Sequence, residues 1–339
     1  MPAPSAVALV AAALLLPGDP TLVLRLHDAR ITESSGLAAS SRHPGVLWTH
    51  NDGGAAAEVM AVGRTGRTVA TVRLRGIDPY DPEAIAPGRD PAGRPALFLG
   101  DIGDNRLRRP DVSVFRFTEP TRLTDQTVGA TWFRLTYPDG PHDAEALLVD
   151  PRDGRLWLAT KDVFGGGLYR APAGLRTDRP NRLTRVGDVP GLVTDGAFLP
   201  DGRFLLRTYS TVYLYAGPDR PVASAALPET EQGESLAVDG SRLLVGSEGR
   251  DSPVYAVAVP TPSTPPTGTG SAGPTGPATR TGPGTTAGTP GQRDAGRGDD
   301  LGDGLGAAGW AVLAFGTVLA AAAGLAGVRR RRGRRRHAA

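Results

Sequence analysis

The sequence predicts a β-propeller, because one pattern recurs five times between Ser35 and Ala258. Each copy has a small or acidic residue, an aliphatic or aromatic one, a turn rich in Asp, Gly and Pro, and two short strands around a polar tip. Repeats of about 40–60 residues that contain only strands and turns are typical of propeller blades. The five copies begin at Ser35, Glu83, Glu145, Asp195 and Glu234.

Hairpin turns and outer strands complete each predicted blade. Asp-Gly or Pro-Gly chemistry lies between strand-like runs, which indicates hairpins. Further strands are expected at residues 68–74, 131–135, 184–186 and 222–225. The last copy is followed by a proline-rich stretch from Pro260, so residues 21–26 are expected to supply its missing strand and close the ring. We therefore expect five blades, or six if the long spacing between Ala84 and Ala146 holds a degenerate blade.

The predicted propeller, residues 21–259, is long enough to bury a core without disulfides. The chain has no cysteine, which excludes thiolate chemistry and cysteine-based zinc sites. Trp48, Trp132 and Trp157 are expected to pack between blades, and stacking on a carbohydrate is the alternative.

The net charge of +3 comes from the C-terminal tail. Seven arginines lie between residues 329 and 336, and without them 31 basic residues face 35 acidic ones. No part of the predicted propeller interleaves basic and aromatic residues, so we expect no nucleic-acid partner.

The two ends of the chain predict an exported membrane protein. Residues 1–20, with an apolar run at 6–16, are expected to be a signal peptide, although a plain hydrophobic N-terminus is the alternative. Residues 308–328 hold an uncharged apolar stretch long enough to span a bilayer. The arginines of the tail, 329–339, directly follow it and predict a cytoplasmic C-terminus with an extracellular propeller.

Residues 260–307 are rich in Pro, Thr and Gly and nearly lack aliphatic side chains. Such a segment cannot bury enough surface to offset its ordering entropy. We expect a disordered stalk between the propeller and the membrane.

Acidic residues from distant segments are expected to converge on one rim of the central channel. In a four-stranded blade, the start of the first strand and the end of the second lie on the same face. Hard oxygen ligands of this kind suit Ca²⁺. The predicted metal ligands are Glu83, Asp101, Asp104, Asn105 and Glu145. The predicted ligand-binding residues are Asn51, Asp52, Asp143, Lys161, Asp162, Asp195, Glu234 and Glu248.

A structural role for this acidic ring is the competing interpretation, because Asp and Asn before turns often cap backbone groups. His50 and His142 are further candidates, although histidines in loops are commonly surface or hydrogen-bonded residues. The sequence contains no nucleophile elbow, phosphate loop or His-Glu-x-x-His motif, so no catalytic residue is assigned.

Several stretches resemble exported bacterial propellers of the phytase-like and esterase-like group, particularly actinobacterial ones. The resemblance is carried by ESSGLAASSRHPGVLWTHNDGG, DPEAIAPG, LFLGDIGDNRLRRPDVSVFRF and TDGAFLPDGR, and spans Ile31 to Val259. β-Propeller phytases bind calcium through acidic residues at the channel mouth and hydrolyse phosphate monoesters. Asp81-Pro-Glu-Ala-Ile85 is similar to their acidic stretch with the proline displaced. Arg106, Arg108 and Arg109 are the candidates to replace their phosphate-binding basic residues, and a solvated surface loop is the alternative. A second similarity is to gluconolactonase-type propellers, which hold one metal in the channel.

Two functions follow from these observations. The first is a membrane-tethered extracellular propeller whose acidic rim binds a ligand or protein partner, with Ca²⁺ as the candidate ion. The alternative is a calcium-dependent phosphoesterase or esterase, with Glu83 or Glu145 as the base.

Overall fold

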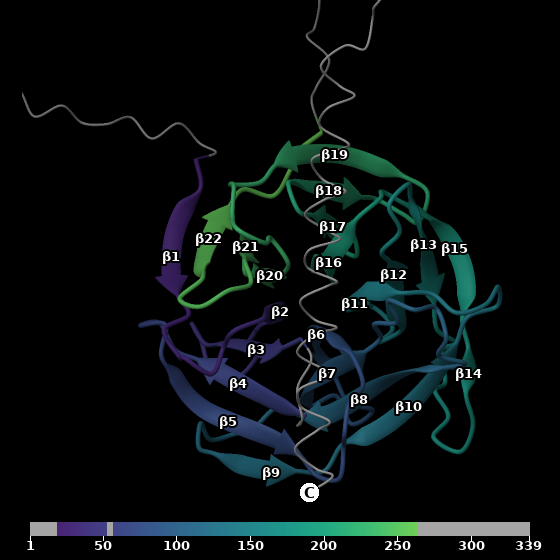
Figure 1. The fold of residues 1–339 in the computed structure, drawn as a ribbon, viewed down its shortest axis with the longest axis horizontal. Coiled ribbons are helices and arrows are strands. Elements are labelled where there is room, and N and C mark those ends of the chain that lie inside the picture. Colours follow the sequence, from purple (N-terminus) through teal and green to yellow (C-terminus); the bar gives the residue numbers. More distant parts are fainter. Residues whose placement is uncertain (1–18, 53–56, 263–339) are drawn as a thin grey trace, which may run out of the picture. The chain divides into compact units, whose positions relative to one another are not determined.

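The computed structural model describes residues 19–52 and 57–262, which form five sheets arranged radially around a central axis (Figure 1). This part of the chain contains strands and turns and no helix, so none of its segments is a membrane-spanning helix. The predicted signal peptide, stalk, membrane segment and basic tail lie outside these residues, apart from a few at their boundaries.

Each sheet is one blade with its first strand nearest the axis, except that the last blade takes its outer strand from the N-terminus. Blade 1 contains β2 (Ser34–Ala39), β3 (Leu47–Asn51), β4 (Glu58–Val62) and β5 (Thr68–Leu74). Blade 2 contains β6 (Pro82–Arg89), β7 (Pro95–Asp101), β8 (Val112–Thr118) and β10 (Thr131–Thr136). Blade 3 contains β11 (Ala144–Val149), β12 (Leu156–Thr160), β13 (Gly166–Arg170) and β15 (Thr184–Val189). Blade 4 contains β16 (Val193–Phe198), β17 (Phe204–Thr208), β18 (Thr211–Tyr215) and β19 (Pro221–Ala226). Blade 5 contains β20 (Leu236–Asp239), β21 (Arg242–Gly246), β22 (Pro253–Val257) and β1 (Thr21–Arg25).

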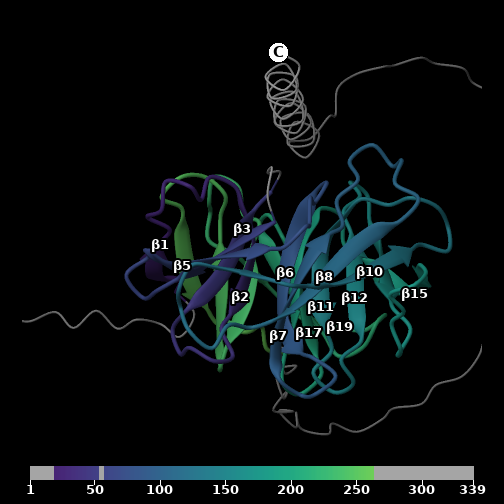
Figure 2. The same cartoon turned by 90° about the horizontal axis from the view of Figure 1, so that it is seen from below.

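The N-terminal strand closes the ring as predicted. β1 pairs antiparallel with β22, so the first described strand completes the last blade. The innermost strands β2, β6, β11, β16 and β20 then contact one another around the axis, and Figure 2 shows the sheets from the side. The five-bladed propeller is confirmed.

The long spacing between Ala84 and Ala146 holds no sixth blade. The connection from β8 to β10 instead carries β9 (Gln126–Val128), which adds a parallel strand to the outer edge of blade 1 beside β5. The connection from β13 to β15 carries β14 (Asn181–Arg182), which pairs parallel with β10 of blade 2. Two successive blades are therefore each linked to the blade before them by backbone hydrogen bonds.

The core consists of five apolar clusters, one between each pair of adjacent blades. Trp48 is fully buried between blades 1 and 2, and Trp157 is buried between blades 3 and 4, as predicted. The prediction for Trp132 is wrong, because this side chain is 51% exposed. It lies on the outermost regular strand of blade 2, where its Nε1 donates a hydrogen bond to Ser113 Oγ at 2.9 Å.

A β-bulge opens the innermost strand in four of the five blades. A bulge adds one residue to a strand and re-aims its side chain. The bulged residues are Ser35, Glu83, Glu145 and Thr194. Asp195 was predicted to match Glu83, but its register is one residue further on, and Thr194 holds the equivalent position. A shift of one residue turns a side chain to the other face of a strand.

Ring closure predicts a strong effect of apolar truncation in β1. Leu24 is 8% exposed and packs in the cluster between blades 5 and 1, whereas Leu22 on the same strand is 48% exposed. Leu24→Ala should lower the free energy of unfolding by about 2–4 kcal/mol in denaturant titrations. Leu22→Ala is the control, and equal effects of the two changes would contradict this role of β1.

Candidate functional site

Equivalent backbone hydrogen bonds in four blades define the channel mouth. A residue one or two positions after the second strand donates its amide to a carbonyl oxygen near the start of the first strand. The accepting residue lies two positions before Ser35, Glu83, Glu145 or Glu234. These pairs are Asp52 to Glu33 at 2.8 Å, Gly103 to Asp81 at 3.1 Å, Lys161 to Asp143 at 2.9 Å and Glu248 to Gln232 at 2.8 Å. The same contact therefore brings equivalent positions from different blades to one opening.

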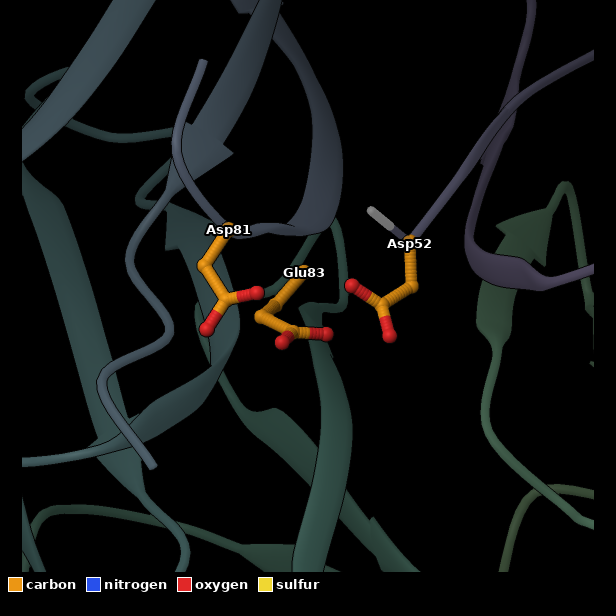
Figure 3. A group of neighbouring side chains, drawn as sticks. All are labelled: Asp52, Asp81 and Glu83. Atoms are coloured by element: carbon orange, nitrogen blue, oxygen red, sulfur yellow. The ribbon is translucent and has the colours of Figure 1, made fainter. Parts of the chain in front are cut away.

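Three carboxylates from blades 1 and 2 meet at this opening. Asp52, Asp81 and Glu83 each offer an oxygen, and these oxygens lie within 4.8 Å of one another. Figure 3 shows Asp81 and Glu83 side by side with Asp52 across from them. Ser35 Oγ donates to Glu83 Oε2 at 3.2 Å and so orients that carboxylate from the neighbouring blade.

Gly103 leaves room for this group. A Cβ at this position would lie 2.6 Å from Glu83 Oε1 and 2.9 Å from Asp81 Oδ2. The equivalent positions in three other blades carry the side chains of Asp52, Lys161 and Glu248. Blade 2 is thus the place where two carboxylates can converge without a competing side chain, and their oxygen donors fit a hard divalent cation.

The other side of the mouth holds the only lysine of the chain. Lys161 Nζ lies 3.1 Å from Glu145 Oε1, 3.9 Å from Glu234 Oε1, and 5.2 Å from the centre of the Tyr209 ring. Burial disfavours the ammonium, but Glu145 and Glu234 hold the pKa of Lys161 well above its usual value. Glu234 Oε2 is buried without a hydrogen-bond partner among the described residues.

Burial and mutual repulsion favour the neutral form of several of these carboxyls. The pKa of Glu83 is raised well above its usual value by burial and then by the charges of Glu145, Asp52 and Asp81. Burial also raises the pKa of Glu145, against the opposing effect of Lys161. The pKa of Glu248 is raised to about 8 by burial and by the charge of Glu234.

Two other predicted metal ligands, Asp101 and Asp104, accept hydrogen bonds in and next to the loop beside the group. Asp101 Oδ1 accepts hydrogen bonds from the Asp81 amide at 2.8 Å and from Arg109 Nη1 at 2.9 Å. Asp104 Oδ2 accepts from the amides of Arg108 and Arg109, both at 2.6 Å. Asn105 is exposed in the same loop. Asp101 and Asp104 therefore hold the loop that carries Gly103.

Among the predicted ligand-binding residues, Asn51, Asp143 and Asp195 are engaged with the backbone. Asn51 Oδ1 accepts from the amides of Thr32 and Glu33, and Asp143 Oδ1 accepts from the Asp104 amide at 2.6 Å. Asp195 accepts from the amides of Gly196 at 2.7 Å and Leu236 at 2.6 Å. Asp162 is exposed on the loop after Lys161. Asp52, Lys161, Glu234 and Glu248 face the mouth.

Neither histidine candidate belongs to the three-carboxylate group. His50 is 1% exposed, its Nε2 has no hydrogen-bond partner among the described residues, and burial lowers its pKa to about 4. His142 Nε2 lies 3.0 Å from both Asp139 Oδ1 and the Tyr169 hydroxyl.

From the sequence, Asp81 and Tyr209 are expected on the channel rim, but neither is assigned as a ligand, and Gly103 is given no role of its own. Asp81 carried a usable signal, because it lies two residues before Glu83 in the Asp-Pro-Glu segment. The role of Gly103 depends on a close approach that no local pattern reveals.

Comparison with known proteins shows a likeness of fold alone. No family model matches the sequence, and no curated protein matches it. A gluconolactonase from Xanthomonas campestris is 13% identical with a TM-score of 0.40, over 72% of this chain and 97% of that one. A protein provisionally assigned as a gluconolactonase is 12% identical with a TM-score of 0.41, over 72% and 93% of the two chains. A chain of the nidogen–laminin complex is 14% identical with a TM-score of 0.38, over 66% and 74%. Similarity at this level says nothing about activity or site residues.

The raised pKa of Glu248 predicts a stability change with pH in cation-free buffer. Above the usual pKa of 4.5 the unfolded chain is ionised here while the folded chain keeps the proton, so stability falls between pH 4.5 and about 8. Glu248→Gln should lose less stability over this interval, and the two proteins should differ least at pH 4. Denaturant titrations across the interval measure this, with Glu229→Gln, an exposed carboxylate, as the control. A profile of Glu248→Gln parallel to that of the unmodified protein would contradict the burial effect.

Proposed function

We propose that the protein binds a divalent cation, foremost Ca²⁺, through Asp52, Asp81 and Glu83, and presents this channel mouth to a ligand or partner. The observation that carries the proposal is the convergence of three carboxylate donors within 4.8 Å of one another. Carboxylate oxygens are the ligands that Ca²⁺ prefers in proteins. Further donors from the backbone, water or the bound partner complete such a coordination sphere.

The charge balance at the mouth supports a cation over an anion. Lys161 lies between Glu145 and Glu234, so its charge is already compensated. Burial, followed by repulsion from the charges of Glu145, Asp52 and Asp81, raises the pKa of Glu83 against the opposing effect of Lys161. A divalent cation relieves this repulsion, and a free phosphate or carboxylate would increase it.

The proposal includes an extracellular, membrane-tethered location. It rests on the apolar stretch at residues 308–328 and the arginines that follow it. The C-terminus is then cytoplasmic, and the partner of the channel mouth is a ligand or protein outside the cell.

Calcium titration of the full chain tests the cation site. Saturating Ca²⁺ at about a hundred times its dissociation constant should stabilise the protein by about 2.7 kcal/mol. Glu83→Gln removes a donor from the group and should abolish most of this gain. Thermal unfolding with and without Ca²⁺ measures the effect.

Asp178→Asn is the matched control, because Asp178 is an exposed carboxylate that pairs with Arg176 away from the mouth. It should leave the Ca²⁺ response unchanged. Failure of the unmodified protein to respond to Ca²⁺, or equal responses of Glu83→Gln and Asp178→Asn, would overturn the proposal.

A phytase-like phosphoesterase or an esterase is the second candidate. The observation that favours it is a buried Glu145 with a raised pKa beside Lys161, on the same mouth as the proposed cation. A bound cation would polarise the phosphoryl or carbonyl group of the substrate. A raised pKa makes a carboxylate a stronger general base toward water, which is the role of Glu145 or Glu83 here.

Turnover separates the two candidates. A hydrolase should cleave p-nitrophenyl phosphate or p-nitrophenyl acetate in the presence of Ca²⁺, and Glu145→Gln should lower kcat by about 10²–10⁴-fold. The Ca²⁺-dependent stabilisation should persist in this variant, because Glu145 is outside the three-carboxylate group. Stabilisation by Ca²⁺ without turnover of either substrate favours the binding function.

A further inference from the structure

A large cavity lies at the end of the channel opposite the acidic mouth. Its volume is about 1050 Å³, and the later residues of all five innermost strands line it. The acidic mouth lies at the starts of these strands, and the cavity is lined by the residues that follow. The cavity thus belongs to the same channel as the proposed cation site but has a separate opening.

The lining of this cavity is mainly apolar. From the innermost strands it receives Leu37, Ile85, Leu147, Ala197 and Leu236. It also extends into the space between blades 2 and 3, where its lining includes Phe98, Phe133 and Leu175. A concave apolar site of this size accommodates a small organic molecule.

Most charged side chains at the cavity are already paired. Asp90 Oδ2 lies 2.7 Å from Arg94, Asp150 Oδ2 lies 2.6 Å from Arg152, and Asp153 Oδ2 lies 3.1 Å from Arg155. Arg89 and Arg116 also line the cavity, and neither forms an ion pair within the described part of the chain. The charged lining side chains without an ion pair among the described residues are therefore both guanidinium groups, and the charge of Asp90 also acts on Arg116.

Arg116 is the better placed of the two guanidinium groups. It lies on β8 between Phe115 and Phe117, and its guanidinium carbon is 5.2 Å from the centre of the Phe133 ring. Among the described residues it makes no hydrogen bond, whereas Arg89 donates to the Gly93 carbonyl oxygen at 2.7 Å. Burial lowers the pKa of Arg116. A half-buried guanidinium that donates no hydrogen bond to the described residues is matched by an anionic group.

We propose that this cavity binds a small amphipathic anion, with an apolar body in the channel and a carboxylate or similar acidic group on Arg116. The apolar lining supplies the area for the body, and the guanidinium over Phe133 selects the charge. The two openings of the channel then prefer opposite charges, a cation at one end and an anion at the other. This inference does not depend on the proposed cation site.

Calorimetric titration of the full chain with decanoate, below its micelle concentration, tests the site. Decanol and decylammonium are matched probes with the same chain length and a neutral or positive head group. The expected result is saturable binding of one decanoate per chain, with decanol at least tenfold weaker and decylammonium weaker still. Equal binding of the three probes, or no binding of decanoate, would overturn the proposal.

Variants locate the head group. Arg116→Gln should weaken decanoate binding at least tenfold while leaving decanol binding unchanged, and Arg116→Lys should retain a preference for the anion. Arg170→Gln is the matched control, since Arg170 also lies over an aromatic ring, Trp157 at 5.5 Å, and does not line the cavity. The same loss in Arg170→Gln as in Arg116→Gln would contradict the assignment. If Arg116→Gln does not fold, the probe selectivity of the unmodified protein and of Arg116→Lys decides the question.

Discussion

The pairing of β1 with β22 is the contact on which the whole architecture depends. It joins the two ends of the propeller, and only a closed ring brings the starts of β2 and β20 next to each other. Each apolar cluster lies between two blades, so a gap between blades 5 and 1 would expose the cluster that contains Leu24 and Val254. The channel mouth is a consequence of this closure, because its side chains come from every blade.

The carboxylates at the channel mouth are positioned by β-bulges and by the absence of a side chain at Gly103. The bulges at Glu83 and Glu145 re-aim carboxylates that a regular strand would direct elsewhere. Gly103 leaves the space that two of the three clustered carboxylates occupy. The apolar clusters supply the stability that offsets the burial of these charges. The opposite end of the channel has the reverse character, with a mainly apolar lining and Arg116, which forms no ion pair within the described part of the chain.

The sequence repeats made the fold predictable. The site was harder to predict, because its contacts join residues of different repeats and leave no pattern in the sequence. The recurring pattern located the innermost strands, and the proline-rich stretch after blade 5 explained why β1 closes the ring. Glu83, Glu145 and Glu234 were found because equivalent positions face the same opening. Asp195 was aligned one residue off, since Thr194 and Asp195 are both compatible with a polar strand start. β9 and β14 are too short to show periodicity, and the pairing of Asp101 with Arg109 is visible only in three dimensions.

We propose that carboxylates from separate blades, Asp52 of blade 1 and Asp81 and Glu83 of blade 2, form one cation site. A crystal structure of the protein grown with Ca²⁺ tests it most directly, because calcium scatters anomalously and its position can be assigned. We expect an ion at about 2.3–2.6 Å from oxygens of Asp52, Asp81 and Glu83. An ion bound only elsewhere, or these three carboxylates surrounded by water alone at saturating Ca²⁺, would contradict it.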